Sequence, residues 1–159
     1  MENLHRYYLS LGSNIEPEKH LREAIVLLGQ YGTVTDLSSV WESHPLGGVG
    51  PNYLNVCAAL EVAVSEPVLK TEIIASIEAV LGRTRTNDRN APRTIDIDIL
   101  MEDDRPLHHE RWEHPFVVVP LAELVPARIH PTTGRRLEDE AEMQRVSTWI
   151  RRHPLLLRE

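Results

Sequence analysis

Two aspartates, Asp96 and Asp98, alternate with isoleucines in the segment Thr-Ile-Asp-Ile-Asp-Ile-Leu at 94–100. Residues two apart on a β-strand project from the same face, so the pattern predicts a strand that carries two neighbouring carboxylates. A cation between them would relieve their repulsion, and magnesium commonly takes one or two carboxylates together with substrate phosphates. A solvent-facing strand edge gives the same pattern, so the pair alone allows either interpretation.

A cluster of arginines lies just before this strand. The stretch 83–93 contains one acid, Asp88, and four arginines: Arg83, Arg85, Arg89 and Arg93. In a chain of net charge −7, such a local cluster favours a small polyanionic ligand. Arginines beside a metal site can neutralise charge on a transferring phosphoryl group. They can also form ion pairs with the aspartates, and both can hold in the empty protein.

Length and composition predict one domain, 1–159. The chain has 159 residues, of which 42% are apolar, enough for a core without disulfides. Cys57 is the single cysteine, which excludes an intrachain disulfide and argues against a cysteine-based zinc site. The net negative charge disfavours nucleic-acid binding. The start does not resemble a signal peptide and no apolar run is long enough to span a membrane, so we expect a cytoplasmic protein.

Periodicity and turn residues predict the element order βαββαβ, followed by a C-terminal extension. The predicted strands are 7–11, 34–41, 53–64 and 94–100, and the two predicted helices of this unit begin at Pro17 and Pro67. The extension holds a short apolar segment at 116–119, a short helix at 121–124 and a terminal helix at 138–150. The order is that of an α+β, ferredoxin-like antiparallel sheet with helices on one face.

Several further segments follow one another in a recognisable order. They are Leu-Gly-Ser-Asn at 11–14, Glu-Ser-His-Pro-Leu-Gly at 42–47, Tyr-Leu-Asn at 53–55, the stretches 77–85 and 92–100, and Phe-Val-Val-Val-Pro-Leu-Ala-Glu-Leu at 116–124. Together they resemble the signature of the 6-hydroxymethyl-7,8-dihydropterin pyrophosphokinase family, a folate-pathway enzyme family. The similarity extends from residue 7 to about residue 131.

The resemblance implies a ferredoxin-like fold and an ATP-dependent transferase. Such an enzyme moves pyrophosphate from MgATP to the hydroxymethyl group of 6-hydroxymethyl-7,8-dihydropterin in one step, giving AMP and the pterin diphosphate. Asp96 and Asp98 would hold two Mg²⁺ ions that bridge the ATP phosphates. Arg83 and Arg93 would grip the phosphates and stabilise the transferring group, so these four residues would be catalytic.

The resemblance also assigns the two substrate pockets. Asn55 would bond the polar edge of the pterin, and Tyr53 and Phe116 would flank its ring, with Ser43 and Leu46 beside it. The residues implied at the ATP site are Glu78, Arg83, Arg85, Arg93, Ile99 and His114.

The sequence departs from the family pattern around these pockets. It has Asn-Ala-Pro-Arg at 90–93, where the family usually has Trp-Gly-Pro-Arg, and Ala75 where the family often has glutamine. The segment between His114 and Phe116 then lacks several residues that usually include an arginine. An alternative register places His108 at the family histidine; we prefer His114. Because Asn90 offers little apolar surface to a closing loop, we expect weaker ATP binding than the charged residues alone would suggest.

Two rival functions remain. A relative that binds nucleotide or pterin but has lost catalysis would share most of these residues, and the change at Asn90 favours it. A two-metal phosphodiesterase could also use the aspartate pair, although the acidic net charge disfavours nucleic acid. For the assembly we expect a monomer or a weak homodimer.

Overall fold

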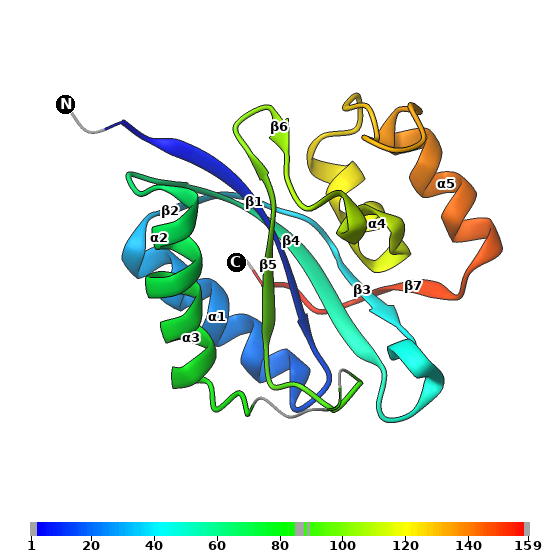
Figure 1. Cartoon of the computed structure of the whole chain (residues 1–159). Coiled ribbons are helices and arrows are strands. Elements are labelled where there is room, and N and C mark those ends of the chain that lie inside the picture. Colours follow the sequence, from blue (N-terminus) through cyan, green and yellow to red (C-terminus); the bar gives the residue numbers. More distant parts are fainter. Residues whose placement is uncertain (1–2, 85–87, 89, 158–159) are drawn as a thin grey trace.

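A computed structural model describes residues 3–84, 88 and 90–157. Within them lies a seven-stranded sheet with the order β6-β5-β1-β4-β3-β7, in which β2 also pairs with β4 and every pairing is antiparallel (Figure 1). The strands are β1 (His5–Ser13), β2 (Thr33–Leu37), β3 (Val40–Ser43), β4 (Tyr53–Val62), β5 (Asp96–Glu102), β6 (Arg105–Pro106) and β7 (Ile150–His153). The α+β antiparallel fold predicted from the sequence is confirmed.

Helices cover both faces of the sheet. They are α1 (Pro17–Tyr31), α2 (Glu66–Val68), α3 (Ala75–Val80), α4 (Pro115–Leu124) and α5 (Leu137–Ser147), and a π-helical segment (Leu69–Ile74) joins α2 to α3. The two helices of the βαββαβ unit, α1 and α2–α3, lie on one face as predicted, and the extension places α4 and α5 on the other (Figure 1).

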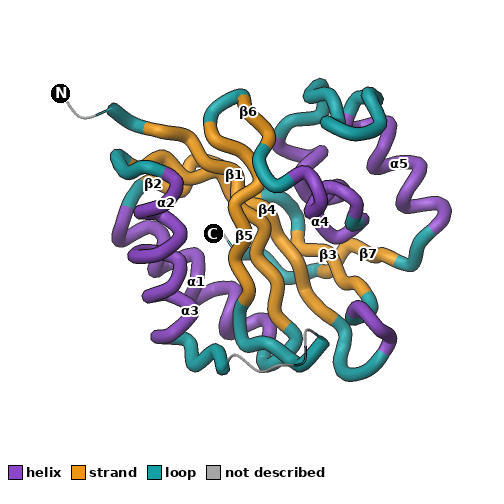
Figure 2. The backbone as a smooth tube through the Cα atoms, in the orientation of Figure 1, coloured by secondary structure: helices purple, strands orange, loops and turns teal. Residues whose placement is uncertain are grey.

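The central strand β1 contributes to a separate core on each face. Its residues Tyr7, Leu9 and Leu11 are fully buried in the core under α1 and α3, whereas Tyr8 belongs to the core under α4 and α5. This alternation follows from the period of two in a strand. Figure 2 shows β1 between β4 and β5, so the sequence segments that carry the predicted site residues are neighbours in the sheet.

Two predictions about regular structure, for the segments 34–41 and 116–119, were wrong in detail. The strand predicted at 34–41 is interrupted at 38–39, where the Ser38 hydroxyl accepts the Cys57 N–H. The two parts, β2 and β3, pair with successive stretches of the same strand β4. The segment 116–119 is the first turn of α4, with Pro115 at its start. Its valines are buried among other apolar groups, and packing of this kind overrides their preference for strands.

The terminal helix was also predicted too long. It ends at Ser147, and Ile150 begins β7, which pairs antiparallel with β3. None of the helices in the described part of the chain is long and apolar enough to cross a membrane.

Candidate active site

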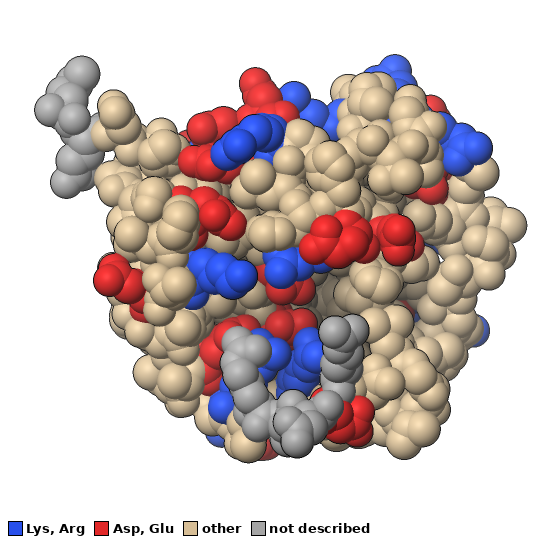
Figure 3. All heavy atoms as spheres, viewed as in Figure 1, with Lys and Arg blue, Asp and Glu red and all other residues tan. Residues whose placement is uncertain are grey.

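The face of the sheet that carries α4 becomes polar toward one end. On β1 the aromatic Tyr8 is followed on this face by Ser10 and Gly12, and on β5 the aliphatic core gives way to Asp98 and Asp96. The strand register pairs Ser10 with Asp98 and Gly12 with Asp96. Small residues therefore lie beside both carboxylates, which leaves space above the sheet. Figure 3 shows acidic and basic side chains gathered in the middle of this region.

A first cavity opens beside β1, β3 and β4. Its lining residues are Ser10, Gly12, Ser43, His44, Pro45, Leu46, Tyr53, Asn55, Asn90, Arg93, Asp96, Asp98 and Phe116. The five residues predicted to hold the pterin all lie in this set. Asn55 is 3% exposed, and its amide donates to the Trp41 carbonyl at 3.0 Å and to the Ser43 hydroxyl at 2.9 Å. These bonds fix the orientation of the Asn55 side chain at the wall of the cavity.

A second cavity lies on the other side of the aspartates, between β5 and the helical segment α2–α3. Its lining residues are Lys70, Thr71, Ile74, Ala75, Glu78, Arg83, Arg93, Asp96, Ile97, Asp98, Ile99, His108 and Arg111. It contains four of the six residues predicted for ATP, namely Glu78, Arg83, Arg93 and Ile99. Arg85 lies outside the described residues. The π-helical segment at this wall was not predicted, and such segments are frequent at functional sites.

Within the described part of the chain, three charged residues line both cavities: Arg93, Asp96 and Asp98. Two arginines hold the Asp96 carboxylate, one at each oxygen. Arg83 Nη1 lies 3.0 Å from Oδ1, and Arg93 Nη1 lies 2.7 Å from Oδ2. Arg111 Nη2 lies 3.4 Å from Oδ1 of Asp98. The aspartate pair therefore lies at the boundary between the two cavities, and arginines contact both of its carboxylates.

The charge of Asp98 is disfavoured in this setting. Burial and the negative charge of Asp96 raise the pKa of Asp98 to about 6, against the opposing effect of Arg111. The positive charges of the arginines therefore do not fully compensate the negative charges of the two carboxylates. Paired hard oxygen donors with uncompensated negative charge fit Mg²⁺, the cation that the resemblance implies.

Glu78 connects the helix to the strand that carries the aspartates. Its carboxylate accepts the Ile97 N–H at 3.1 Å and pairs with Arg83, which in turn contacts Asp96. Glu78 is buried, so the pairing with Arg83 offsets the cost of burying its charge. Glu78 therefore acts on the site indirectly, because it fixes the position of Arg83 relative to β5.

The histidine of the second cavity is His108. His114 lies instead beside Phe116, with the two rings stacked at a centroid distance of 4.8 Å. This placement favours the alternative register over the preferred one. Arg111 was not predicted at all, yet it lines the second cavity and donates to the Ile99 carbonyl at 3.1 Å. The alignment register that places His108 in the second cavity also places Arg111, three residues later, in that cavity.

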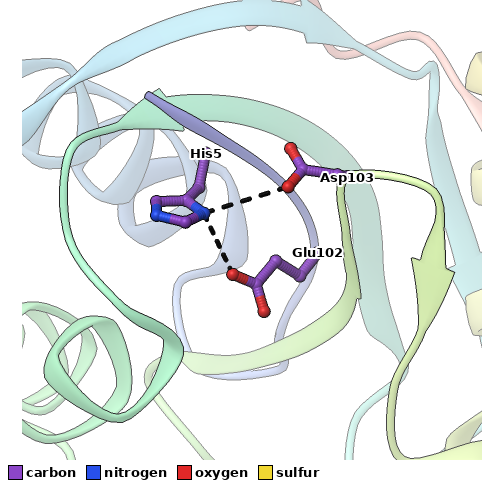
Figure 4. Close-up of side chains that lie close together, drawn as sticks. All are labelled: His5, Glu102 and Asp103. Atoms are coloured by element: carbon purple, nitrogen blue, oxygen red, sulfur yellow. Dashed lines mark ion pairs between the residues drawn. The ribbon is translucent and has the colours of Figure 1, made fainter. Parts of the chain in front are cut away.

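Another group of ionisable side chains lies at the far end of β1 and β5. His5 Nδ1 lies 3.1 Å from Glu102 Oε2 and 3.8 Å from Asp103 Oδ2 (Figure 4). The Tyr7 hydroxyl also donates to Glu102 Oε2, and Arg105 pairs with Oε1 at 2.9 Å. Because both oxygens of Glu102 are already engaged, we interpret the group as an ion-pair network that ties β1 to the β5–β6 turn.

An antiparallel α+β sheet with two cavities that meet at a charged boundary fits an enzyme that transfers a charged group between two substrates. A family profile described as 7,8-dihydro-6-hydroxymethylpterin-pyrophosphokinase matches residues 8–126. The chain belongs to this pyrophosphokinase family, whose activity serves folate biosynthesis.

Named relatives agree with this assignment. Two bacterial proteins carry the name 2-amino-4-hydroxy-6-hydroxymethyldihydropteridine pyrophosphokinase. The one from Synechocystis sp. is 34% identical over 147 residues, covering 86% of this chain and 74% of the relative. The one from Bacillus subtilis is 37% identical over 129 residues, covering 74% and 76% respectively.

Solved structures agree in fold. A crystal structure of Plasmodium falciparum HPPK-DHPS matches with a TM-score of 0.72 at 12% identity. The match covers 95% of this chain and 48% of that one, so this chain spans about half the length of the two-part protein.

Proposed function

We propose that this chain transfers pyrophosphate from MgATP to the hydroxymethyl group of 6-hydroxymethyl-7,8-dihydropterin, with the pterin in the first cavity and ATP in the second. One observation carries the proposal: the two cavities meet at the aspartate pair and share Arg93. A group that moves between two bound substrates must pass such a boundary. The proposal treats 1–159 as one domain of this kind, as a monomer or weak homodimer in the cytoplasm, where ATP is abundant.

The first cavity suits a flat heterocycle with a polar edge. Phe116 and Tyr53 supply aromatic surface for a ring. The buried Asn55 supplies its amide oxygen to a ring edge, because its amide nitrogen already donates to Trp41 and Ser43. Burial and the charge of Asp96 raise the pKa of Tyr53, whereas the charge of Arg93 opposes them, so its hydroxyl stays neutral at physiological pH. The cavity therefore offers hydrogen bonds and stacking, and its charges lie at the end next to the second cavity.

The second cavity suits a polyphosphate. Arg83, Arg93 and Arg111 converge on it and pair with the aspartates. Asp96 and Asp98 would hold Mg²⁺, which would neutralise charge on the phosphates and polarise the transferred group. In this proposal the same arginines exchange a carboxylate for phosphate oxygens when ATP binds. We assign the nucleotide-site histidine to His108.

Positioning accounts for the catalysis in this proposal. Phosphoryl-type transfer needs little help from a strong base, because its transition state is stabilised mainly by placement and charge. The chain fixes the two substrates on either side of β5 and supplies arginines at the point where charge develops. We therefore assign no general base.

The decisive test is product formation. Purified protein with ATP, Mg²⁺ and 6-hydroxymethyl-7,8-dihydropterin should release AMP only when the pterin is present. A binding relative without catalysis would bind both substrates and release no AMP. A phosphodiesterase would instead cleave a generic diester such as bis(p-nitrophenyl) phosphate without any pterin, and that outcome would contradict the proposal.

Asn55→Ala is expected to weaken pterin binding by about 1–3 kcal/mol, because a buried polar ring edge loses its partner. Phe116→Ala should weaken it by about 1 kcal/mol through lost stacking. Calorimetric titration with the pterin measures both effects. An ATP analogue, titrated into the same variants, serves as the control and should bind as before. Unchanged pterin affinity in both variants would reject the first cavity as the pterin site.

The loop at 44–51 offers a matched pair of glycines for testing the rim of this cavity. A Cβ on Gly47 would lie 2.8 Å from Nδ2 of Asn90, whereas a Cβ on Gly48 would meet nothing within 4 Å. Both residues have positive φ, 83° and 72°, so alanine strains the backbone at either position. We expect Gly47→Ala to lower pterin affinity by about 1 kcal/mol more than Gly48→Ala, because only Gly47→Ala displaces Asn90 from the cavity wall. Equal titration curves for the two variants would show that Asn90 is not part of the pterin site.

A further inference from the structure

The C-terminal extension reaches the rim of the first cavity. The family profile ends at residue 126, so α5 and β7 lie beyond the part of the chain that this profile matches. β7 pairs antiparallel with β3, and in this register Ile150 lies opposite Ser43, a lining residue of the cavity. The residue before β7, Trp149, is therefore placed next to the loop that follows β3.

Trp149 stacks on His44, the first residue of that loop. The ring centroids are 4.2 Å apart and the planes differ by 15°, which is close to parallel. The edge of the His44 ring is fixed as well, because Nδ1 lies 3.0 Å from Oδ1 of Asn52. The Arg151 guanidinium lies 5.1 Å from the centroid of the Trp149 ring and adds a cation–π contact. His44 is thus held at its face by the extension and at its edge by the loop.

The loop needs such an anchor. It contains Gly47, Gly48 and Gly50, all with positive φ, and glycines in a short loop leave the backbone many alternative conformations. Leu46 at the cavity wall is half exposed, so the rest of the protein covers only part of this residue. Stacking of His44 restricts the backbone at the start of the loop. It therefore limits the conformations of Pro45 and Leu46, which form the cavity wall.

We propose that Trp149 is a positioning residue for the pterin: it holds His44, and with it the wall at Pro45 and Leu46, in the binding geometry. This inference rests on the proposed function, since it takes the first cavity as the pterin site. Trp149 itself does not line that cavity. Its effect would be to reduce the number of loop conformations that the pterin must select on binding.

The extension is attached to the sheet independently of this stack. Trp41 packs beneath two guanidinium groups of the extension, Arg145 at 4.9 Å and Arg152 at 5.2 Å from its ring centroid. Ile150 is buried in the core under α4 and α5. Removal of the Trp149 ring should therefore leave α5 and β7 in place, and Arg145→Ala provides a control that loses an aromatic contact of the same extension away from His44.

The test compares Trp149→Ala, Trp149→Phe and Arg145→Ala with the wild type in steady-state kinetics, with each substrate varied in turn. Trp149→Ala should raise the KM for the pterin about fivefold, with kcat and the KM for ATP changed by less than about twofold. Trp149→Phe should restore most of the pterin KM, because a phenyl ring can still stack, and Arg145→Ala should match the wild type. Calorimetry with the pterin alone should show the same ranking.

An unchanged pterin KM in Trp149→Ala would overturn the inference, and so would a uniform loss of activity accompanied by a lower melting temperature in that variant. Failure of the proposed function would look different, because the wild type itself would then release no AMP when the pterin is added.

Discussion

Asp96→Ala and Asp98→Ala should each lower turnover by about a thousandfold, a loss of about 4 kcal/mol of transition-state stabilisation, while the protein still folds. Each variant removes one of the two carboxylates proposed to hold Mg²⁺. Neither side chain belongs to an apolar core, since both face the boundary between the cavities. AMP release at saturating substrates measures the loss, and circular dichroism checks the fold. Substantial activity in both variants would refute the metal assignment.

Asp98→Asn should raise the stability of the metal-free protein at pH 8. The pKa of Asp98 is about 6 in the folded chain, above its ordinary value of 3.8, because burial and Asp96 disfavour its charge despite Arg93 and Arg111. Between these values the folded state binds more protons than the unfolded state, so the ionised group costs stability above pH 6 and the cost disappears toward pH 4. A third of the side chain is exposed, so we expect the free energy of unfolding of Asp98→Asn to exceed that of the wild type by only about 1 kcal/mol.

Urea denaturation of both proteins at pH 8 and pH 5, without Mg²⁺, measures this gain, which should shrink at the lower pH. Added Mg²⁺ is the internal control, because it should stabilise the wild type and have little effect on Asp98→Asn. A variant that is less stable than the wild type at pH 8 would mean that the ion pair with Arg111 outweighs the repulsion by Asp96.

The part of this site that could be predicted from sequence depends on local periodicity. Alternation in 94–100 was enough to place Asp96 and Asp98 side by side, because strand geometry fixes that relation whatever the rest of the chain does. The arginines were predicted as a cluster because four of them lie within residues 83–93 of the sequence. The actual pairing, with Arg83 and Arg93 at opposite oxygens of Asp96, depends on how the helix end and the loop approach the strand.

The parts that could not be predicted depend on tertiary packing. The valines of α4 favour a strand by propensity, and only their burial against β4 and α5 makes them helical. β7 is four residues long, and its pairing with β3 carries no local signal. His108 was considered but not preferred, and Arg111 was missed. The places of both residues depend on the length of the β5–β6 hairpin and of the segment after it, and an alignment gap can be placed on either side of them.

Arg93→Ala is expected to reduce turnover about a hundredfold, a loss of about 3 kcal/mol. Among the residues that the structure describes, Arg93 is the only cation that lines both cavities. The backbone at this position should survive the change. The Arg93 N–H donates to Asn14 Oδ1 at 2.8 Å, and its carbonyl accepts the Asn14 N–H at 3.1 Å. Loss of the side chain therefore removes a charge from the boundary without releasing the approach to β5.

Arg111→Ala is the matched comparison, since Arg111 lines the second cavity alone and pairs with the other aspartate. If Arg93 stabilises the group in transit, Arg93→Ala lowers kcat and leaves the pterin affinity nearly unchanged, whereas Arg111→Ala mainly raises the KM for ATP. Arg93→Lys should recover only part of kcat, because an ammonium group keeps the charge but loses the paired donors of guanidinium. A normal kcat and a weakened pterin affinity in Arg93→Ala would mean that Arg93 contributes to pterin binding and not to the transfer step.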